Sequence, residues 1–218
     1  MPAIMTNPLL FKYAAVLGSL LMIAGCLVAG LAYRGKTGER YSPLNHFISE
    51  LGEVGVSRRA WAFNASAVLC GFLLLPAAIQ LGLLLPGWLA KIALVFGALT
   101  SIALIFVGFF SLDRYNPHSK AAIAFFRCGL MTVLLYSLAI LTQPAGKTII
   151  PRAAGWVGIP TMAAFIWFVY LIWKAHQNQD RALEAEETSR PTVMIVAVAE
   201  WAVFVGIVGW FLTLAMLL

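Results

Sequence analysis

Six long apolar segments dominate this chain and restrict the folds open to it. They cover approximately residues 9–33, 61–85, 88–110, 117–142, 153–173 and 192–217. A helix needs about 20 apolar residues to cross the hydrocarbon core of a bilayer, and each segment is long enough. The 218 residues are 61% hydrophobic and only 11% charged, so one helical bundle accounts for the whole length. We therefore predict an all-α polytopic membrane protein, a six-transmembrane-helix bundle forming one domain over residues 1–218.

Charge and cysteine content argue against several other classes. The net charge of +6 is scattered over the loops and forms no basic stripe, so we expect no nucleic-acid partner. The first apolar run is too long for a signal peptide and lacks a small-residue cleavage site, which predicts a retained helix. Cys26, Cys70 and Cys128 fall inside predicted spans without a CxxC pattern, which favours reduced core residues over disulfides. No cofactor is expected.

Positive charge is unevenly distributed between the two ends of the predicted bundle. Six spans place both termini on one side, and most Lys and Arg residues lie near the other side. The positive-inside rule therefore predicts that loops 34–60, 111–120 and 174–191 are cytoplasmic and that both termini face out.

The longest polar segment, residues 41–64, joins the first two spans. Ser42 is a suitable N-cap and Pro43 suits the first helical position. Apolar residues then recur at helical spacing on one face: Leu44, Phe47, Ile48 and Leu51. Gly52 and Gly55 can end this helix. We predict a short interfacial amphipathic helix over residues 44–51, which is either a membrane-surface connector or the wall of a site.

A polar cluster is predicted where this segment meets the third loop, because both open on the same membrane face. The candidates for catalysis are Ser49, Glu50, Asp113 and His118, and the candidates for ligand binding are His46, Asn64, Arg58, Arg59, Arg114, Asn116 and Lys120. Asn116 and Pro117 predict the start of the fourth span. His118 would then lie in the first turn of that helix, where free N–H groups favour an anion.

Several chemistries are open to this cluster. His46, His118, Glu50 and Asp113 are metal-ligand types, but HExxH and paired histidines are absent, so no metal is predicted. Ser49, His118 and Asp113 could form a hydrolase triad, although no GxSxG surrounds the serine. The basic side chains near the cluster could instead hold a lipid phosphate: Arg58, Arg59, Arg114 and Lys120. The remaining alternative is a hydrogen-bonded interface that only fixes the bundle.

Two charged residues fall well inside predicted spans. Arg127 is 10 residues beyond Pro117 and Glu200 is 8 beyond Thr192, so both lie at similar depth from the same face. An unpaired arginine at such depth costs roughly 2.5–3.5 kcal/mol on insertion scales. We therefore predict a buried ion pair between Arg127 and Glu200.

Three short motifs carry a family resemblance: ISELG at 48–52, FN at 63–64, and VGFFSLD followed by NPH within 107–118. They resemble the bacterial and archaeal six-span membrane family of domain of unknown function 998, which is akin to eukaryotic DRAM/Sfk-type proteins. The resemblance implies a bacterial or archaeal plasma membrane and lipid-linked roles. It also implies functional positions at Ser49, Glu50, Gly52, Asn64, Asp113 and His118, with Glu50 where Asp is expected. Relatives with a long first loop are drawn with that loop outside, opposite to the charge count.

The function predicted from these observations is binding of a lipid head group or other amphiphile at the polar cluster, with membrane lipids as partners. A hydrolytic or transfer activity on that ligand is an open extension. One alternative is an accessory subunit that docks on partner membrane subunits through its apolar faces. A small-solute transporter ranks last, because paired discontinuous helices and an internal repeat are absent.

Overall fold

The computed structural model describes residues 7–177 and 190–218, and it contains six helices that are long and apolar enough to cross a membrane. They are α1 (Pro8–Ala32), α2 (Ala60–Leu84), α3 (Trp88–Phe109), α4 (Tyr115–Leu141), α5 (Gly158–Gln177) and α6 (Ile195–Leu217). Two short 3₁₀ helices, η2 (Ile48–Gly52) and η3 (Arg152–Val157), lie in the first and fourth connections. The predicted all-α six-helix architecture is confirmed.

Local chemistry explains where the helices begin. The Asn7 side chain accepts a hydrogen bond from the Leu9 amide at 3.0 Å and caps α1. Gly87, with φ of +89°, makes the turn that opens α3. Pro160 lies in the first turn of α5, where a proline removes no helical hydrogen bond.

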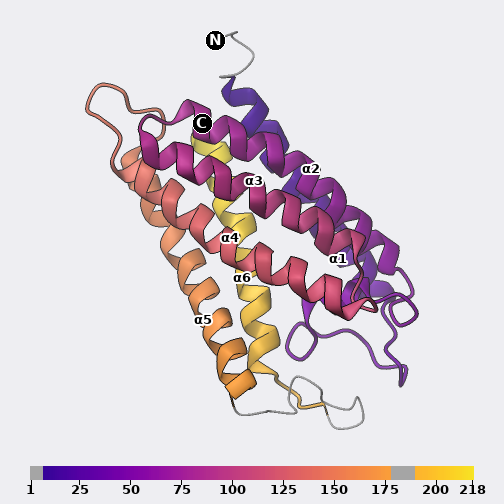
Figure 1. Ribbon diagram of the computed structural model, residues 1–218. Coiled ribbons are helices and arrows are strands. Elements are labelled where there is room, and N and C mark those ends of the chain that lie inside the picture. The colour runs from indigo at the N-terminus through magenta and orange to yellow at the C-terminus, as the bar shows by residue number, and fades with distance from the viewer. Residues whose placement is uncertain (1–6, 178–189) are drawn as a thin grey trace.

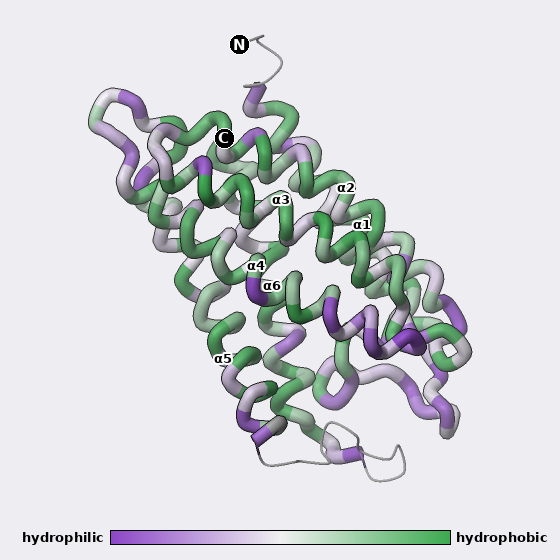
Figure 2. The backbone as a smooth tube through the Cα atoms, in the orientation of Figure 1, coloured by the Kyte–Doolittle hydropathy of each residue, from purple (hydrophilic) through white to green (hydrophobic). Residues whose placement is uncertain are grey.

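Helices that are neighbours in sequence are neighbours in space. α1 packs on α2, α2 on α3 and α3 on α4, whereas α5 and α6 form a pair that returns to α4 and α1. The chain termini lie at one end of the bundle, as predicted for six spans, and the first and third loops lie at the other (Figure 1). Hydrophobic residues run along the helices, and hydrophilic residues concentrate in the loops, above all in the connection between α1 and α2 (Figure 2).

Small residues let α1, α2 and α3 approach closely. A Cβ on Gly71 of α2 would lie 2.7 Å from the carbonyl oxygen of Ser101 on α3. A Cβ on Gly108 of α3 would lie 2.5 Å from the carbonyl oxygen of Asn64 on α2. Because lipid tails are as apolar as leucine, such close contact is a main source of helix association in a bilayer. A Cβ on Gly25 of α1 would lie 2.9 Å from the carbonyl oxygen of Ala62 on α2, so all three helices pack at close range.

The predicted interfacial helix over residues 44–51 is only partly correct. Its second half forms η2, but residues 43–46 are turns, and Leu44 is 52% exposed whereas Leu51 is fully buried. In an α-helix the amide of Ile48 would donate to the carbonyl of Leu44. Here that amide donates to Glu200 Oε2 at 2.7 Å, and the Leu44 carbonyl accepts from the Met194 amide at 2.7 Å. Contacts with the start of α6 thus replace the helical hydrogen bond.

Candidate functional site

We call the connection between α1 and α2, residues 33–59, the covering loop. It is held against the segment that leads into α6. Arg190 Nη1 donates to the Asn45 carbonyl at 2.9 Å, and Asn45 Nδ2 donates to the Pro191 carbonyl at 3.1 Å. The amide of Met194 completes this contact through the Leu44 carbonyl. Since every one of these bonds joins distant parts of the chain, they fix the covering loop in place over one end of the bundle.

A buried ion pair strengthens the same contact. Arg190 Nη1 lies 3.0 Å from both Oε1 and Oε2 of Glu50, whose side chain is 8% exposed. The Phe47 amide donates to Oε1 at 2.7 Å, and Tyr33 Oη lies 3.5 Å from Oε2. Burial acts to lower the pKa of Arg190, but the hydrogen bond to Glu50 and the nearby charges of Glu50, Tyr33 and Glu39 together outweigh burial and raise it. Burial and the nearby Glu50 charge raise the pKa of Tyr33, which keeps that hydroxyl a donor.

Aromatic side chains surround this ion pair. Trp201 Nε1 donates to Tyr41 Oη at 2.9 Å, and Tyr41 Oη donates to the Phe47 carbonyl at 3.0 Å. The His46 ring packs against Tyr33 and Tyr41 with centroid separations of 5.3 and 5.1 Å. Burial lowers the pKa of His46, so its imidazole is neutral at pH 7. The network is a packed, nearly complete hydrogen-bonded unit.

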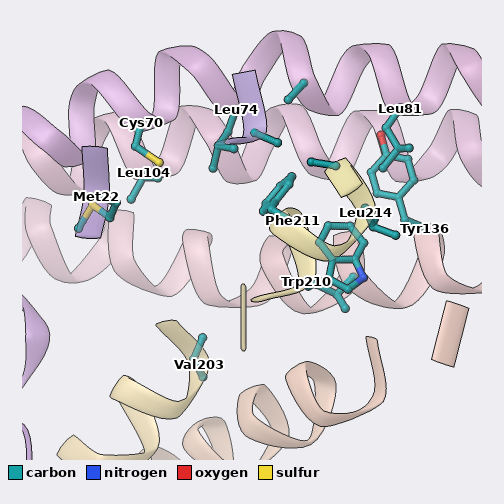
Figure 3. Close-up of a cluster of buried hydrophobic side chains, with 14 of the residues drawn as sticks. Met22, Cys70, Leu74, Leu81, Leu104, Tyr136, Val203, Trp210, Phe211 and Leu214 are labelled. Carbon is teal, nitrogen blue, oxygen red and sulfur yellow. The ribbon is translucent and has the colours of Figure 1, made fainter. Parts of the chain in front are cut away.

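Beneath the covering loop lies a central cavity with a volume of ≈ 110 Å³. An apolar cavity of about 150 Å³ can hold benzene, so a space of this size can hold a slender apolar group. Its walls come from η2, α1, α2, α3, α4 and α6, and most of the side chains are apolar. Figure 3 shows several of them, with Cys70, Leu74 and Leu104 on one side and Val203 of α6 on the other.

One wall of the central cavity is less covered than the others. The wall residues of α1 and α2 are buried, whereas Phe125 and Phe126 of α4 and Phe204 and Val208 of α6 are half-buried. α4 and α6 make little contact with each other. The cavity is therefore least covered on the side formed by α4 and α6.

Three polar side chains gather at the end of the cavity beneath the covering loop, and we call them the polar end: Ser49, His118 and Glu200. His118 Nδ1 lies 2.7 Å from the Phe110 carbonyl, which fixes the imidazole. Glu200 is 7% exposed and accepts one hydrogen bond, through Oε2 from the Ile48 amide. Trp210 lies 10 residues further along α6, so the cavity extends for ~15 Å from the polar end.

The structure brings together only part of the predicted catalytic set. Ser49 and His118 line the same cavity, but Glu50 does not line it and is paired with Arg190. Asp113 is exposed and accepts a hydrogen bond from the Val54 amide at 3.3 Å. Contacts with Ser111 and Val54 lower the pKa of Asp113, which remains an ionised surface carboxylate. The predicted Ser–His–Asp triad is therefore not assembled, because the Phe110 carbonyl takes the position on His118 that Asp113 would occupy.

The predicted ligand-binding residues separate into two groups. His46 is buried in the aromatic network, and Asn64 Nδ2 donates to the Gly52 carbonyl at 2.9 Å, where it joins η2 to α2. The others are exposed at the loop end of the bundle and do not line the cavity: Arg58, Arg59, Arg114, Asn116 and Lys120. Within the residues that the structure describes, no group of three or more His, Cys, Asp or Glu side chains is placed to hold a metal ion.

The predicted ion pair between Arg127 and Glu200 is not formed. Arg127 is exposed on α4, whereas Glu200 faces the cavity from α6. The two residues do lie at comparable depth, but α4 presents a different face to the cavity, namely the stripe through His118, Phe125 and Gly129. Arg127 projects away from that stripe, so matching depth did not bring the charges together.

Sequence reasoning missed four residues of the network: Tyr33, Tyr41, Arg190 and Trp201. Arg190 carried a signal, because it precedes Pro191 directly before the last span, where a basic residue can turn back toward the bundle. The two tyrosines flank the covering loop at the membrane boundary, where aromatic residues usually act as anchors. Their pairing with Glu50 and Trp201 depends on tertiary contacts.

These features define a multi-pass helical membrane protein with an interior cavity under a bonded loop. The chain belongs to the family described as "Protein of unknown function (DUF998)", whose sequence profile matches residues 16–217. The family resemblance read from the short motifs is thereby confirmed. No curated protein and no solved structure matches the chain. The relation to DRAM-type proteins stays a prediction.

Proposed function

We propose that the protein binds a single-chain amphiphile, with the apolar chain in the central cavity and the polar group at the polar end. The observation that carries the proposal is the lining of the cavity, which is mostly apolar and has its one carboxylate and its one imidazole at one end. The hydroxyls of Thr100, Ser101 and Thr132 elsewhere in its wall donate to backbone carbonyls. Binding sites for small molecules share this pattern of apolar walls with a few placed polar groups.

The half-buried wall formed by α4 and α6 supports the same conclusion. An amphiphile dissolved in the bilayer would enter between α4 and α6, past the half-buried side chains of Phe125 and Phe204. Its chain would lose no hydrophobic stabilisation on the way, because it moves from lipid into an apolar cavity. Specificity then depends on the polar end, where desolvated groups discriminate strongly between partners.

The proposal differs from phosphate binding by loop cations. Arg58, Arg59, Arg114 and Lys120 are exposed outside the cavity and can hold phosphates only at the membrane surface. The proposal is also one of binding rather than hydrolysis, because Asp113 contacts Val54 instead of His118. An accessory subunit would need no cavity of this kind, which places that alternative second.

A substitution that fills the cavity tests the proposal. Val203 lines the cavity and is 1% exposed, whereas Val205, two residues along α6, is 63% exposed to the surroundings of the bundle. The wild type, Val203→Trp and Val205→Trp are purified in a mild detergent, and the extracted amphiphiles are quantified by mass spectrometry. Wild type and Val205→Trp should carry the same ligand, and Val203→Trp should lose most of it. Equal recovery from a folded Val203→Trp protein would contradict the proposal.

A further inference from the structure

Glu200 is a buried carboxylate that the protein leaves largely uncompensated. It is 7% exposed, and among the residues that the structure describes its only hydrogen bond is the one that Oε2 accepts from the Ile48 amide. Oε1 accepts no hydrogen bond from any residue that the structure describes, and no ion pair in that part of the chain involves Glu200. The Glu200 side chain also lines the cavity that a ligand would occupy.

Two basic residues could have paired with Glu200, and neither of them does. Arg190 lies at the entrance to α6, but its guanidinium is bonded to both oxygens of Glu50. Arg127, at similar depth, is exposed on α4 and turned away. An ionised carboxylate in apolar surroundings is costly unless a cation accompanies it. A buried carboxyl group without a cation takes up a proton instead, so a bound cation is the ligand charge that lets Glu200 stay ionised.

The remaining groups of the polar end suit a small cationic head group. A primary ammonium offers three N–H donors. The Glu200 carboxylate and the Ser49 hydroxyl line the same end of the cavity and can both accept from it. Ile48 and Ser49 of η2 are the part of the covering loop that lines this end of the cavity.

We infer that the ligand is a cationic amphiphile, a long-chain primary amine whose ammonium group pairs with Glu200. This inference rests on the proposed function and adds the chemical class of its head group. A phosphate or carboxylate head would bring a second negative charge beside Glu200, and an alcohol would leave that charge without a counter-ion. The amine should therefore bind more tightly than either of them with the same chain.

The test uses three ω-brominated dodecyl compounds, an amine, an alcohol and a carboxylate, added to the full-length protein in phosphatidylcholine nanodiscs at neutral pH. Bromine quenches tryptophan fluorescence at short range, and Trp210 lies in the cavity wall ~15 Å along α6 from Glu200. A chain whose head group is at Glu200 places its bromine near Trp210. The Trp210→Phe protein supplies the background from bromine in the bilayer and from the other tryptophans.

The amine should quench Trp210 at the lowest concentration. Glu200→Gln should weaken the amine by roughly 10- to 100-fold, because a charged hydrogen bond is lost, and should leave the alcohol nearly unchanged. Glu200→Asp should restore part of the preference. Equal binding of amine and alcohol to the wild type would overturn the inference while the proposed function stands. Absence of quenching by all three would overturn both. Because the wild-type comparison is decisive alone, poor folding of Glu200→Gln does not spoil the test.

Discussion

Arg190 and Glu50 are 140 positions apart in the sequence and form a buried ion pair, with Arg190 Nη1 3.0 Å from each carboxylate oxygen. This contact joins the covering loop to the residues that lead into α6. It holds η2 where the Ile48 amide can meet Glu200. The covering loop and the polar end of the cavity are therefore joined in one hydrogen-bonded unit.

We predict strong energetic coupling between these two residues. Glu50→Gln or Arg190→Gln alone should lower the free energy of unfolding by about 3 kcal/mol, because each strands a buried charge. The double variant should cost clearly less than the sum. Thermal and denaturant unfolding in detergent gives the double-mutant cycle. The pair Lys36–Glu53, at 3.9 Å with side chains 59% and 21% exposed, is the control and should couple by less than ~1 kcal/mol. Additive effects of the Glu50 and Arg190 substitutions would refute this coupling.

Stability should fall on acidification because of His46. Burial lowers the pKa of His46 below its usual value, an effect that Arg190 supports and that Glu50 and Glu39 oppose. At a pH between the folded and unfolded pKa values, His46 is protonated in the unfolded chain and neutral in the folded chain. The stabilisation is fully present above about pH 6.5, the ordinary histidine pKa, and is lost as the pH falls through the folded value. The melting temperature between pH 7.5 and pH 5 should drop in the wild type and drop less in His46→Gln. If the melting temperatures of the two proteins fall equally with pH, the loss of stability does not come from His46.

Two glycine substitutions separate helix packing from helix propensity. Gly71→Ala places a Cβ 2.7 Å from the Ser101 carbonyl oxygen, a backbone atom that cannot move aside, and overpacking of this kind costs about 1–3 kcal/mol. A Cβ at Gly209 meets nothing within 4 Å, so Gly209→Ala should be neutral or stabilise by up to ~1 kcal/mol through helix propensity. The melting temperature of Gly71→Ala should fall, and that of Gly209→Ala should stay the same or rise. A similar change in both would show that the α2–α3 contact is not tight.

Membrane orientation follows from the distribution of Lys and Arg. We predict that the covering loop is cytoplasmic and that the connection between α4 and α5 faces out. Thr37→Cys and Lys147→Cys, both at exposed positions, are made in a background lacking Cys26, Cys70 and Cys128. A membrane-impermeant maleimide should label the Lys147 variant in intact cells and the Thr37 variant only after permeabilisation. The reverse pattern would show that Arg and Lys were placed for the loop network rather than for topology.

The fold was predictable because each transmembrane helix is specified locally. Apolar length determines a span, and signals such as Pro8 at the start of α1 and the Pro86–Gly87 turn determine its ends. The start of α4 was predicted at Pro117 and lies at Tyr115, a difference within the usual uncertainty of helix boundaries.

The site was less predictable because its bonds join distant segments. The sequence stripe of Leu44, Phe47, Ile48 and Leu51 predicted an α-helix. The Ile48 amide donates to Glu200 instead of to the Leu44 carbonyl, so the α-helix does not form there. Depth along a helix gave Arg127 and Glu200 the same level, yet depth does not determine which face of a helix a residue occupies. The partner of Glu50 is Arg190, which no local pattern identifies.

The most direct test of the account is density in the central cavity of an experimentally determined structure, obtained after gentle purification without added lipid. The account predicts elongated density that begins beside Glu200 and Ser49 and continues along α6 toward Trp210. Val203→Trp, prepared in the same way, should lack it. A cavity that is closed by the surrounding side chains, or one that contains only ordered water along its length, would contradict the central claim.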